Sequence, residues 1–263
     1  MIERHEHLGK LVTDTTAQLS ATSPWLVVST SPAHPASAEF NAASGRDIQQ
    51  WIGRQVADWP APIPLGGEPP DVRPDRLTFA PARQPGRTAN SYYYAFDSDG
   101  SVVGGLQVGA LQNSPPDGEP VWALGEGAVA WITIAMLRLN AAFARHVSAL
   151  GEAAVEVAVV CPVDTSPTVP IQVWNHAGGA YGPAGTRQYT GVGSARSAVD
   201  LTTCLSPRLT MTARPFLVDL LQQFGVSEPR HVDPSGVVRR RHFTGHDELI
   251  HAWADAIGIP SEP

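Results

Sequence analysis

Hydrophobic and polar positions follow extended and helical spacings in turn along the chain, which predicts that strands and helices alternate. Residues 2–19 have the polar character of a surface helix, and SPWLVVST predicts a buried strand over residues 25–30. Apolar residues then recur at helical spacing over residues 45–59, which predicts a second helix. Residues 60–85 are dense in proline and glycine, so we expect an irregular loop there.

The middle of the chain contains a predicted hairpin and the strongest predicted helix. Two apolar runs flank the turn sequence DSDG, which is typical of a β-hairpin. After a loop at residues 113–119, residues 124–150 show an apolar stripe at helical spacing that includes His146. This stripe predicts a long helix that ends at Gly151, and it favours a place for His146 at the boundary of the core.

The second half predicts further strands, a glycine-rich loop and two more helices. VEVAVVCPV and IQVWN have the composition of buried strands, and residues 178–193 predict a loop. A helix is expected after Ser206, with Pro215 breaking or restarting it. DPSG fits the turn of a hairpin over residues 229–243, and Thr244 is the expected cap of a final helix that ends at Gly258.

These elements predict an α+β or mixed α/β fold. The two halves share an order of strand, loop, helix, hairpin and helix, which is typical either of an internal duplication or of chance similarity between common strand and turn residues. The duplication predicts a polar helix or tail over residues 1–24 and two similar lobes over residues 25–150 and 151–263. We expect the lobes to pack as one globular unit.

Composition narrows the classes of function. The chain has 263 residues, of which 43% are hydrophobic, so it is long enough to bury a sizeable core. A formal net charge of −7 argues against broad, nonspecific binding to nucleic acid or to anionic membranes. Lys10 is the only lysine, so chemistry that needs a lysine has essentially no candidate residue.

Cysteine usage and hydropathy favour a cytoplasmic protein that does not enter a membrane. Cys161 and Cys204 lie beside apolar residues and outside any CxxC motif, as reduced buried thiols do. The N-terminus is too charged for a signal peptide. The apolar stretch around AVAWITIAML is expected to be too short to span a bilayer before Arg138 interrupts it.

The stretch SGVVRRRHF concentrates positive charge on a short predicted strand. Alternation would place Arg239 and Arg241 on one face and Arg240 and His242 on the other, so the strand cannot be buried on both sides. One interpretation is an edge strand whose charges discourage aggregation. The other is an anion-binding site formed by Arg230, Arg239, Arg241 and His242.

Other motifs give little support for catalysis or for a cofactor. The spacing of His242, His246 and His251 matches no standard zinc pattern, so no metal site is expected. The glycine-rich loop lacks the GK[ST] of a P-loop, and Arg187 and Tyr189 are its candidate ligand contacts. No GxSxG elbow or other catalytic signature occurs in the sequence, and no cofactor is expected.

The sequences DLLQQFGVSEPRHVDPSGVVRRRHF and HAWADAIGI resemble the C-terminal region of a group of actinobacterial proteins. Those proteins begin with a divergent AlbA-type (Schlafen-like) domain that binds nucleic acid or ATP. The present chain is expected to lack that domain, so the function of that domain is not carried over. The resemblance implies an accessory module that regulates or docks.

Three functional hypotheses follow. The first is a non-catalytic regulatory or protein-interaction module, in an actinobacterial regulatory or defence-type system, whose partner is another protein. The second is a module that binds a small anionic ligand or nucleic acid through its arginine-rich hairpin. The third is an enzyme whose site is assembled from distant loops, namely residues 60–85 and 178–193.

Overall fold

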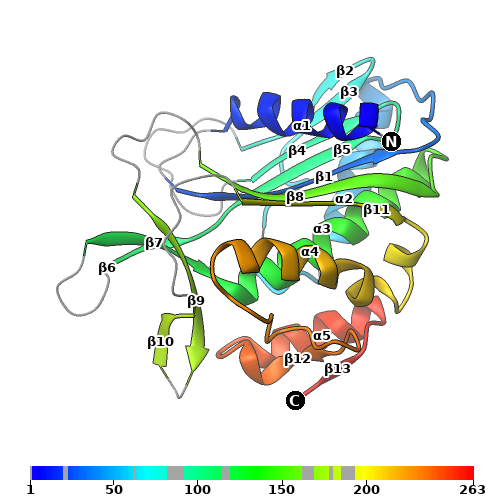
Figure 1. Ribbon diagram of the computed structural model, residues 1–263. Coiled ribbons are helices and arrows are strands. Elements are labelled where there is room, and N and C mark those ends of the chain that lie inside the picture. The colour runs from blue at the N-terminus through cyan, green and yellow to red at the C-terminus, as the bar shows by residue number, and fades with distance from the viewer. Residues whose placement is uncertain are drawn as a thin grey trace.

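The computed structural model describes residues 2–19, 23–61, 63–81, 92–113, 119–161, 169–177, 180–184 and 193–263. A seven-stranded sheet with the strand order β11-β8-β1-β5-β4-β3-β2 forms its centre, and every adjacent pair in it is antiparallel (Figure 1). The strands are β1 (Trp25–Pro32), β2 (Asp71–Arg73), β3 (Arg76–Phe79), β4 (Tyr92–Asp97), β5 (Val102–Gln107), β8 (Glu152–Val160) and β11 (Gly193–Asp200).

The two strands near the middle of the sheet confirm the sequence prediction. Every residue of β1 is buried, and in β8 only the first residue is exposed. Such continuous apolar runs suit strands that are covered on both faces. The predicted hairpin is also confirmed, because β4 and β5 pair across the DSDG turn with Tyr94 opposite Gly104. A Cβ atom at Gly104 would lie 2.2 Å from the Tyr94 ring, so glycine makes room for that ring.

The remaining strands of this sheet correct two predictions. Residues 60–85 are not wholly irregular, because β2 and β3 form a short hairpin that pairs with β4. The strand β11, which was not predicted, begins at Gly193, where the predicted glycine-rich loop ends, and pairs with β8. These strands have few apolar residues, so the apolar pattern did not indicate them.

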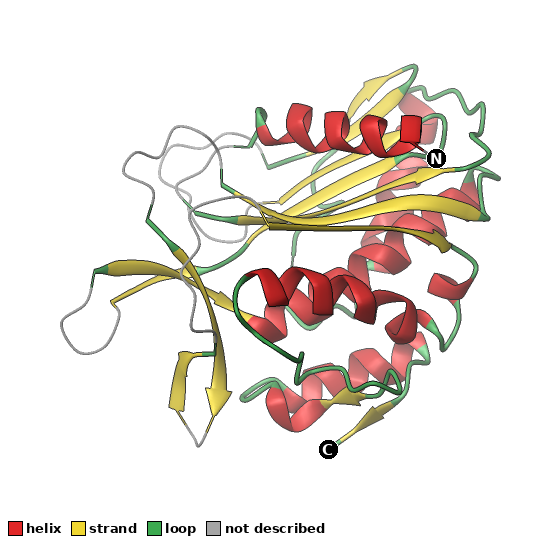
Figure 2. Ribbon diagram, in the orientation of Figure 1, coloured by secondary structure: helices red, strands yellow, loops and turns green. Residues whose placement is uncertain are grey.

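Helices cover both faces of the large sheet (Figure 2). The helix α1 (Ile2–Thr16) lies across β1 and β8 on one face and buries Leu8, Leu11 and Val12 there. The opposite face carries α2 (Ala42–Gln55), α3 (Glu126–His146) and α4 (Leu209–Gln223). The start of α2 precedes the predicted one because the Asn41 side chain accepts hydrogen bonds from the backbone N–H groups of Ala43 and Ser44.

The helix α3 forms the centre of the hydrophobic core. It is long and apolar enough by composition to cross a membrane, contrary to the sequence estimate, but 83% of its most apolar window is buried inside the protein. A helix that is apolar on all sides in this way is typical of a core. Among the described residues, α3 is the only helix that meets the length and hydropathy criteria for a membrane span.

A second sheet, with the order β10-β9-β7-β6, lies beside the body of the protein (Figure 1). Its strands are β6 (Ala110–Asn113), β7 (Pro120–Gly125), β9 (Ile171–Ala177) and β10 (Ala180–Pro183). Only β9 was predicted. The strand β7 pairs in parallel with β9 and continues directly into α3 at Glu126. The start of α3 is therefore held between the two sheets.

The helix α4 corrects the prediction for Pro215, because it passes through that residue without a break. The proline lies on the exposed side of the helix, whereas Phe216, Leu217, Leu220 and Leu221 are buried. Packing of this buried side outweighs the loss of one backbone hydrogen bond. A short 3-10 helix (Thr203–Leu205) precedes α4.

The C-terminal region differs most from the predicted hairpin. The DPSG turn forms, but the returning strand β12 (Val238–Arg239) pairs in parallel with β13 (Ser261–Glu262), and Val238 makes only an isolated bridge to Val232. Arg240–His242 form a 3-10 helix. The final helix α5 (Asp247–Ile257) starts after a turn at Gly245, whose φ is +80°, so the exposed Thr244 does not cap it. The predicted Gly258 ends it in a left-handed conformation.

These elements confirm the α+β class. The seven-stranded sheet takes β1 to β5 from residues 25–150 and β8 and β11 from residues 151–263. One large core cluster likewise contains residues of both ranges. The internal duplication and the division into two lobes stay predictions.

Candidate functional site

A pocket of about 280 Å³ lies where the start of α3, the β9–β10 hairpin and the C-terminal region meet. Segments far apart in the sequence supply its walls. Its described lining residues are Pro60, Ala61, Gly125, Glu126, Gly127, Ala128, Trp131, Trp174, Asn175, His176, Tyr181, His231, His242, Phe243, Thr244, His246 and Ile250. Most of the lining is apolar or aromatic, and a few polar groups are directed into it, as in ligand-binding pockets.

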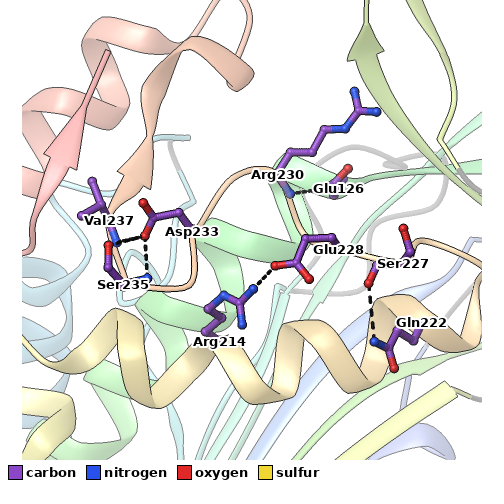
Figure 3. A network of polar contacts seen from close by, with 9 residues as sticks. All are labelled: Glu126, Arg214, Gln222, Ser227, Glu228, Arg230, Asp233, Ser235 and Val237. Atoms are coloured by element: carbon purple, nitrogen blue, oxygen red, sulfur yellow. Dashed lines mark hydrogen bonds and ion pairs between the residues drawn. The ribbon is translucent and has the colours of Figure 1, made fainter.

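Glu126 is a fully buried carboxylate at the base of this pocket. Its Oε1 atom accepts a hydrogen bond of 2.6 Å from the backbone N–H of Arg230 (Figure 3). Its Oε2 atom accepts one of 2.9 Å from Nδ2 of Asn175. The Nδ1 atom of His231 lies 3.2 Å from Oε1. One carboxylate therefore joins the start of α3 to β9 and to the segment that follows α4.

His231 is almost fully buried, and both of its ring nitrogens face oxygen atoms. Nε2 lies 3.0 Å from the backbone carbonyl oxygen of His242, which can only accept a hydrogen bond. Nε2 must therefore donate its proton there. Nδ1 faces the Glu126 carboxylate at an ion-pair distance, although its N–H is not well aligned with the oxygen. Both ring nitrogens of His231 therefore face oxygen atoms of the protein.

The surroundings of Glu126 favour its charged form. Burial alone would raise the pKa of this carboxyl. Contact with His231, its positive charge, and the hydrogen bonds from Arg230 and Asn175 together outweigh burial and hold the pKa of Glu126 below its ordinary value. The pair is therefore an internally neutralised unit at the base of the pocket.

Aromatic side chains from two parts of the chain form walls of the pocket. The hairpin wall consists of Trp174, His176 and Tyr181; the Tyr181 ring centroid lies 5.3 Å from that of Trp174 and 4.9 Å from that of His176. The C-terminal wall consists of His231, His242 and Phe243, in which the His231 ring meets that of Phe243 edge-on at 4.5 Å. Each wall is held by contacts between its own rings.

Glycines flank Glu126 at the start of α3, where both walls approach the helix. A Cβ atom at Gly127 would lie 3.0 Å from Nε2 of His231 and 3.2 Å from Cδ1 of Phe243. At Gly125 it would lie 3.5 Å from the Tyr181 hydroxyl, which is an ordinary contact. Gly127 thus permits the close approach of the C-terminal wall to α3.

Positive charge lies close to one lining residue of the pocket, His242. Arg230 and Arg241 are both exposed, and their charges act on the half-buried His242 ring. Burial, followed by the charges of His231, Arg241 and Arg230, lowers the pKa of His242 below its ordinary value of 6.5. We call Arg230, Arg241 and His242 the rim residues. Glu126 is the only acidic residue among the described lining residues.

Arg239 does not join the other three predicted anion-binding residues. Its guanidinium group forms ion pairs with Asp233, at 2.5 Å, and with Glu262. Asp233 also accepts hydrogen bonds from the backbone of Ser235 and Val237 in the DPSG turn (Figure 3). The predicted shared face of Arg239 and Arg241 is wrong, because the chain turns into a 3-10 helix after Arg239.

Arg187 and Tyr189, the predicted loop contacts, lie outside the described residues. The described part of the chain contains no group of three His, Cys, Asp or Glu side chains able to hold a metal ion. His251, which the sequence places near His242 and His246, lies 3.4 Å from Asp255 of its own helix.

The sequence did not predict the contact between Glu126 and His231. Glu126 stands between two glycines immediately before an apolar helix, which places an acid at a helix N-terminus and is the one local signal of its position. His231 follows Arg230 in a loop, where nothing in the sequence marks it as buried. The contact between Glu126 and His231 joins residues that are distant in the sequence.

The titratable groups at the base of the pocket already have protein partners. Both His231 nitrogens face oxygen atoms, and Glu126 accepts hydrogen bonds from Asn175 and from the backbone of Arg230. The thiols offer no nucleophile either, because burial raises the pKa of Cys161 and raises that of Cys204 to about 12. Comparison with protein-family models, with curated proteins and with solved structures found no match to this chain.

Proposed function

We propose that this protein is a non-catalytic regulatory module that binds a small organic anion in the pocket above Glu126 and His231. The observation that carries the proposal is the charge arrangement. The single acid in the described lining is engaged by its own partners, whereas the exposed Arg230 and Arg241 lie close to the lining residue His242 and form no ion pair with the described residues. An entering anion therefore meets net positive charge.

The engaged state of His231 supports binding over catalysis. A general base needs a free nitrogen within reach of a substrate proton. Here the ring is held by the His242 carbonyl and the Glu126 carboxylate, so it supports the wall instead. A cytoplasmic setting in an actinobacterial regulatory or defence system is proposed from the sequence resemblance and composition.

The test is isothermal titration of the protein with acetate, benzoate and phosphate at low ionic strength. We expect at least one anion to bind, and we expect binding to weaken about tenfold in Arg230→Gln/Arg241→Gln through the loss of charge-assisted hydrogen bonds. Arg46→Gln is the matched control, because Arg46 is exposed on α2 and does not line the pocket. Failure of every anion to bind at millimolar concentration would overturn the proposal.

A protein-interaction role is a second candidate, favoured by the four-stranded sheet. The described strands β6 and β10 are the outer members of that sheet, and each has an exposed large side chain, Leu111 on β6 and Tyr181 on β10. Edges of this kind accept a further strand from a partner protein. Native mass spectrometry of the protein purified with a partner at fixed stoichiometry would support this role if Leu111→Asp abolished the complex.

A further inference from the structure

We propose that the occupant of this pocket is an aromatic monocarboxylate, with its ring between the hairpin wall and the C-terminal wall and its carboxylate at the rim residues. This inference rests on the proposed function, since it names the class of anion that the pocket binds. The aromatic walls determine the shape of that anion, and the rim residues determine its charge.

The shape follows from the walls and from the start of α3. Tyr181 on one wall and Phe243 on the other are both lining residues, and both approach the start of α3, where Gly125 and Gly127 carry no side chains. Trp131 also lines the pocket, and its edge-on contacts with Trp59 and Trp253 hold it in place. Aromatic rings prefer offset or edge-on neighbours at these separations, so a flat ring fits this space better than a branched chain.

The size limits the occupant to one ring system with a short arm. A volume of about 280 Å³ lies just below the roughly 300 Å³ at which pockets for drug-sized ligands begin. A nucleotide or a peptide of several residues would extend far outside such a space. A benzene or indole ring with one or two further carbon atoms would fill it.

The charge of the ligand follows from the positions of the arginines near His242 and of Glu126 at the base of the pocket. Arg230 and Arg241 provide cationic groups close to the lining residue His242, and a guanidinium can bind a carboxylate with two parallel hydrogen bonds. The base of the pocket offers no further cationic group to a second negative charge, because His231 already faces the buried Glu126 carboxylate, so a monoanion is favoured over a phosphate dianion. The anion therefore stays at the mouth while the ring enters.

Four probes of similar size separate these features: phenylacetate, its neutral amide phenylacetamide, cyclohexylacetate and phenyl phosphate. We expect phenylacetate to bind about tenfold or more tightly than each of the other three, as measured by titration calorimetry at low ionic strength. Tyr181→Ala should weaken phenylacetate binding about tenfold, whereas Leu111→Ala, on the opposite edge of the same sheet, should leave it unchanged.

The outcomes distinguish this inference from the proposed function. Equal binding of phenylacetate and cyclohexylacetate, or tighter binding of phenyl phosphate, would overturn the aromatic monocarboxylate while leaving an anion site. Binding of phenylacetamide as tight as that of phenylacetate would overturn the role of the rim residues. If none of the four probes bound at millimolar concentration, and the anions of the previous test also failed, both proposals would fall.

Discussion

The Nδ1 atom of His231 lies 3.2 Å from the Oε1 atom of Glu126, although one residue follows α4 and the other begins α3. The same carboxylate accepts hydrogen bonds from Asn175 of β9 and from the backbone of Arg230. Three chain segments thus meet at one buried charge. Removing one member of such a group leaves the others buried without a partner, which is far more costly than losing an exposed ion pair.

Glu126→Ala should therefore lower the free energy of unfolding by about 3–5 kcal/mol, because the charge of His231 and the Asn175 amide lose their partner. Urea unfolding at neutral pH measures this change. Glu248→Ala is the matched control, since Glu248 is exposed in the first turn of α5, and it should change the free energy by no more than about 0.5 kcal/mol. Similar losses in both variants would contradict a special role for Glu126.

Acidification should destabilise the protein in two stages with distinct origins. The pKa of His242 is lowered from 6.5, so below about that pH the unfolded ring takes up a proton more readily than the folded one. The pKa of Glu126 is lowered from 4.5, so its stabilising contribution is complete above that pH and is lost as the pH falls through the folded value. Both shifts therefore give a stability that rises with pH.

Urea midpoints at a series of pH values, compared between wild type and variants, separate the two stages. The difference between wild type and His242→Gln should change mainly below pH 6.5, and that between wild type and Glu126→Gln mainly below pH 4.5. A difference that stays constant across its own pH window would show that the residue does not contribute through its protonation.

Gly127→Ala should disturb the C-terminal wall, whereas Gly125→Ala should not. The new methyl at position 127 would lie 3.0 Å from His231 and 3.2 Å from Phe243, which costs about 1–3 kcal/mol where a packed ring cannot move. Alanine regains up to about 1 kcal/mol through its helix propensity. Thermal unfolding should therefore place Gly127→Ala below Gly125→Ala. The reverse order would mean that the wall shifts freely.

Pro215→Ala should stabilise α4 without touching the pocket. Alanine restores the backbone hydrogen bond to Met211 that proline cannot donate, and the site is exposed, so no packing is lost. The expected gain is about 1–3 kcal/mol in urea unfolding. Asp219→Ala, an exposed change on the same helix, should give a much smaller effect. A loss of stability in Pro215→Ala would indicate that the proline ring packs usefully.

The spacing of apolar residues predicted those helices and strands that are buried in the core. The strand β1, the β4–β5 hairpin and the helix α3 all contain continuous or regularly spaced apolar residues, and the structure confirms them. The strands β2 and β11 are polar along much of their length and lie at the two edges of the sheet. Such strands are specified by pairing with a neighbour, which a single sequence does not record.

The site was less predictable than the fold. Positive charge drew attention to residues 239–242, and the structure brings His242 and Arg241 to the pocket mouth near Arg230. The sequence could not reveal that Asp233 and Glu262 would engage Arg239, because Glu262 comes from a strand at the far end of the chain. The burial of Glu126 likewise depends on β9 and on the segment after α4.

The antiparallel pairing of β1 with β8 has a consequence for synthesis on the ribosome. When β1 to β5 have emerged, the fully buried β1 still lacks the neighbour that covers one of its edges, and it waits until residues 152–160 have been added. An uncovered apolar edge invites pairing with another chain, and such long-range closure is slow. The nascent protein is therefore exposed to aggregation for a defined interval, and holding chaperones should raise its soluble yield most during that interval.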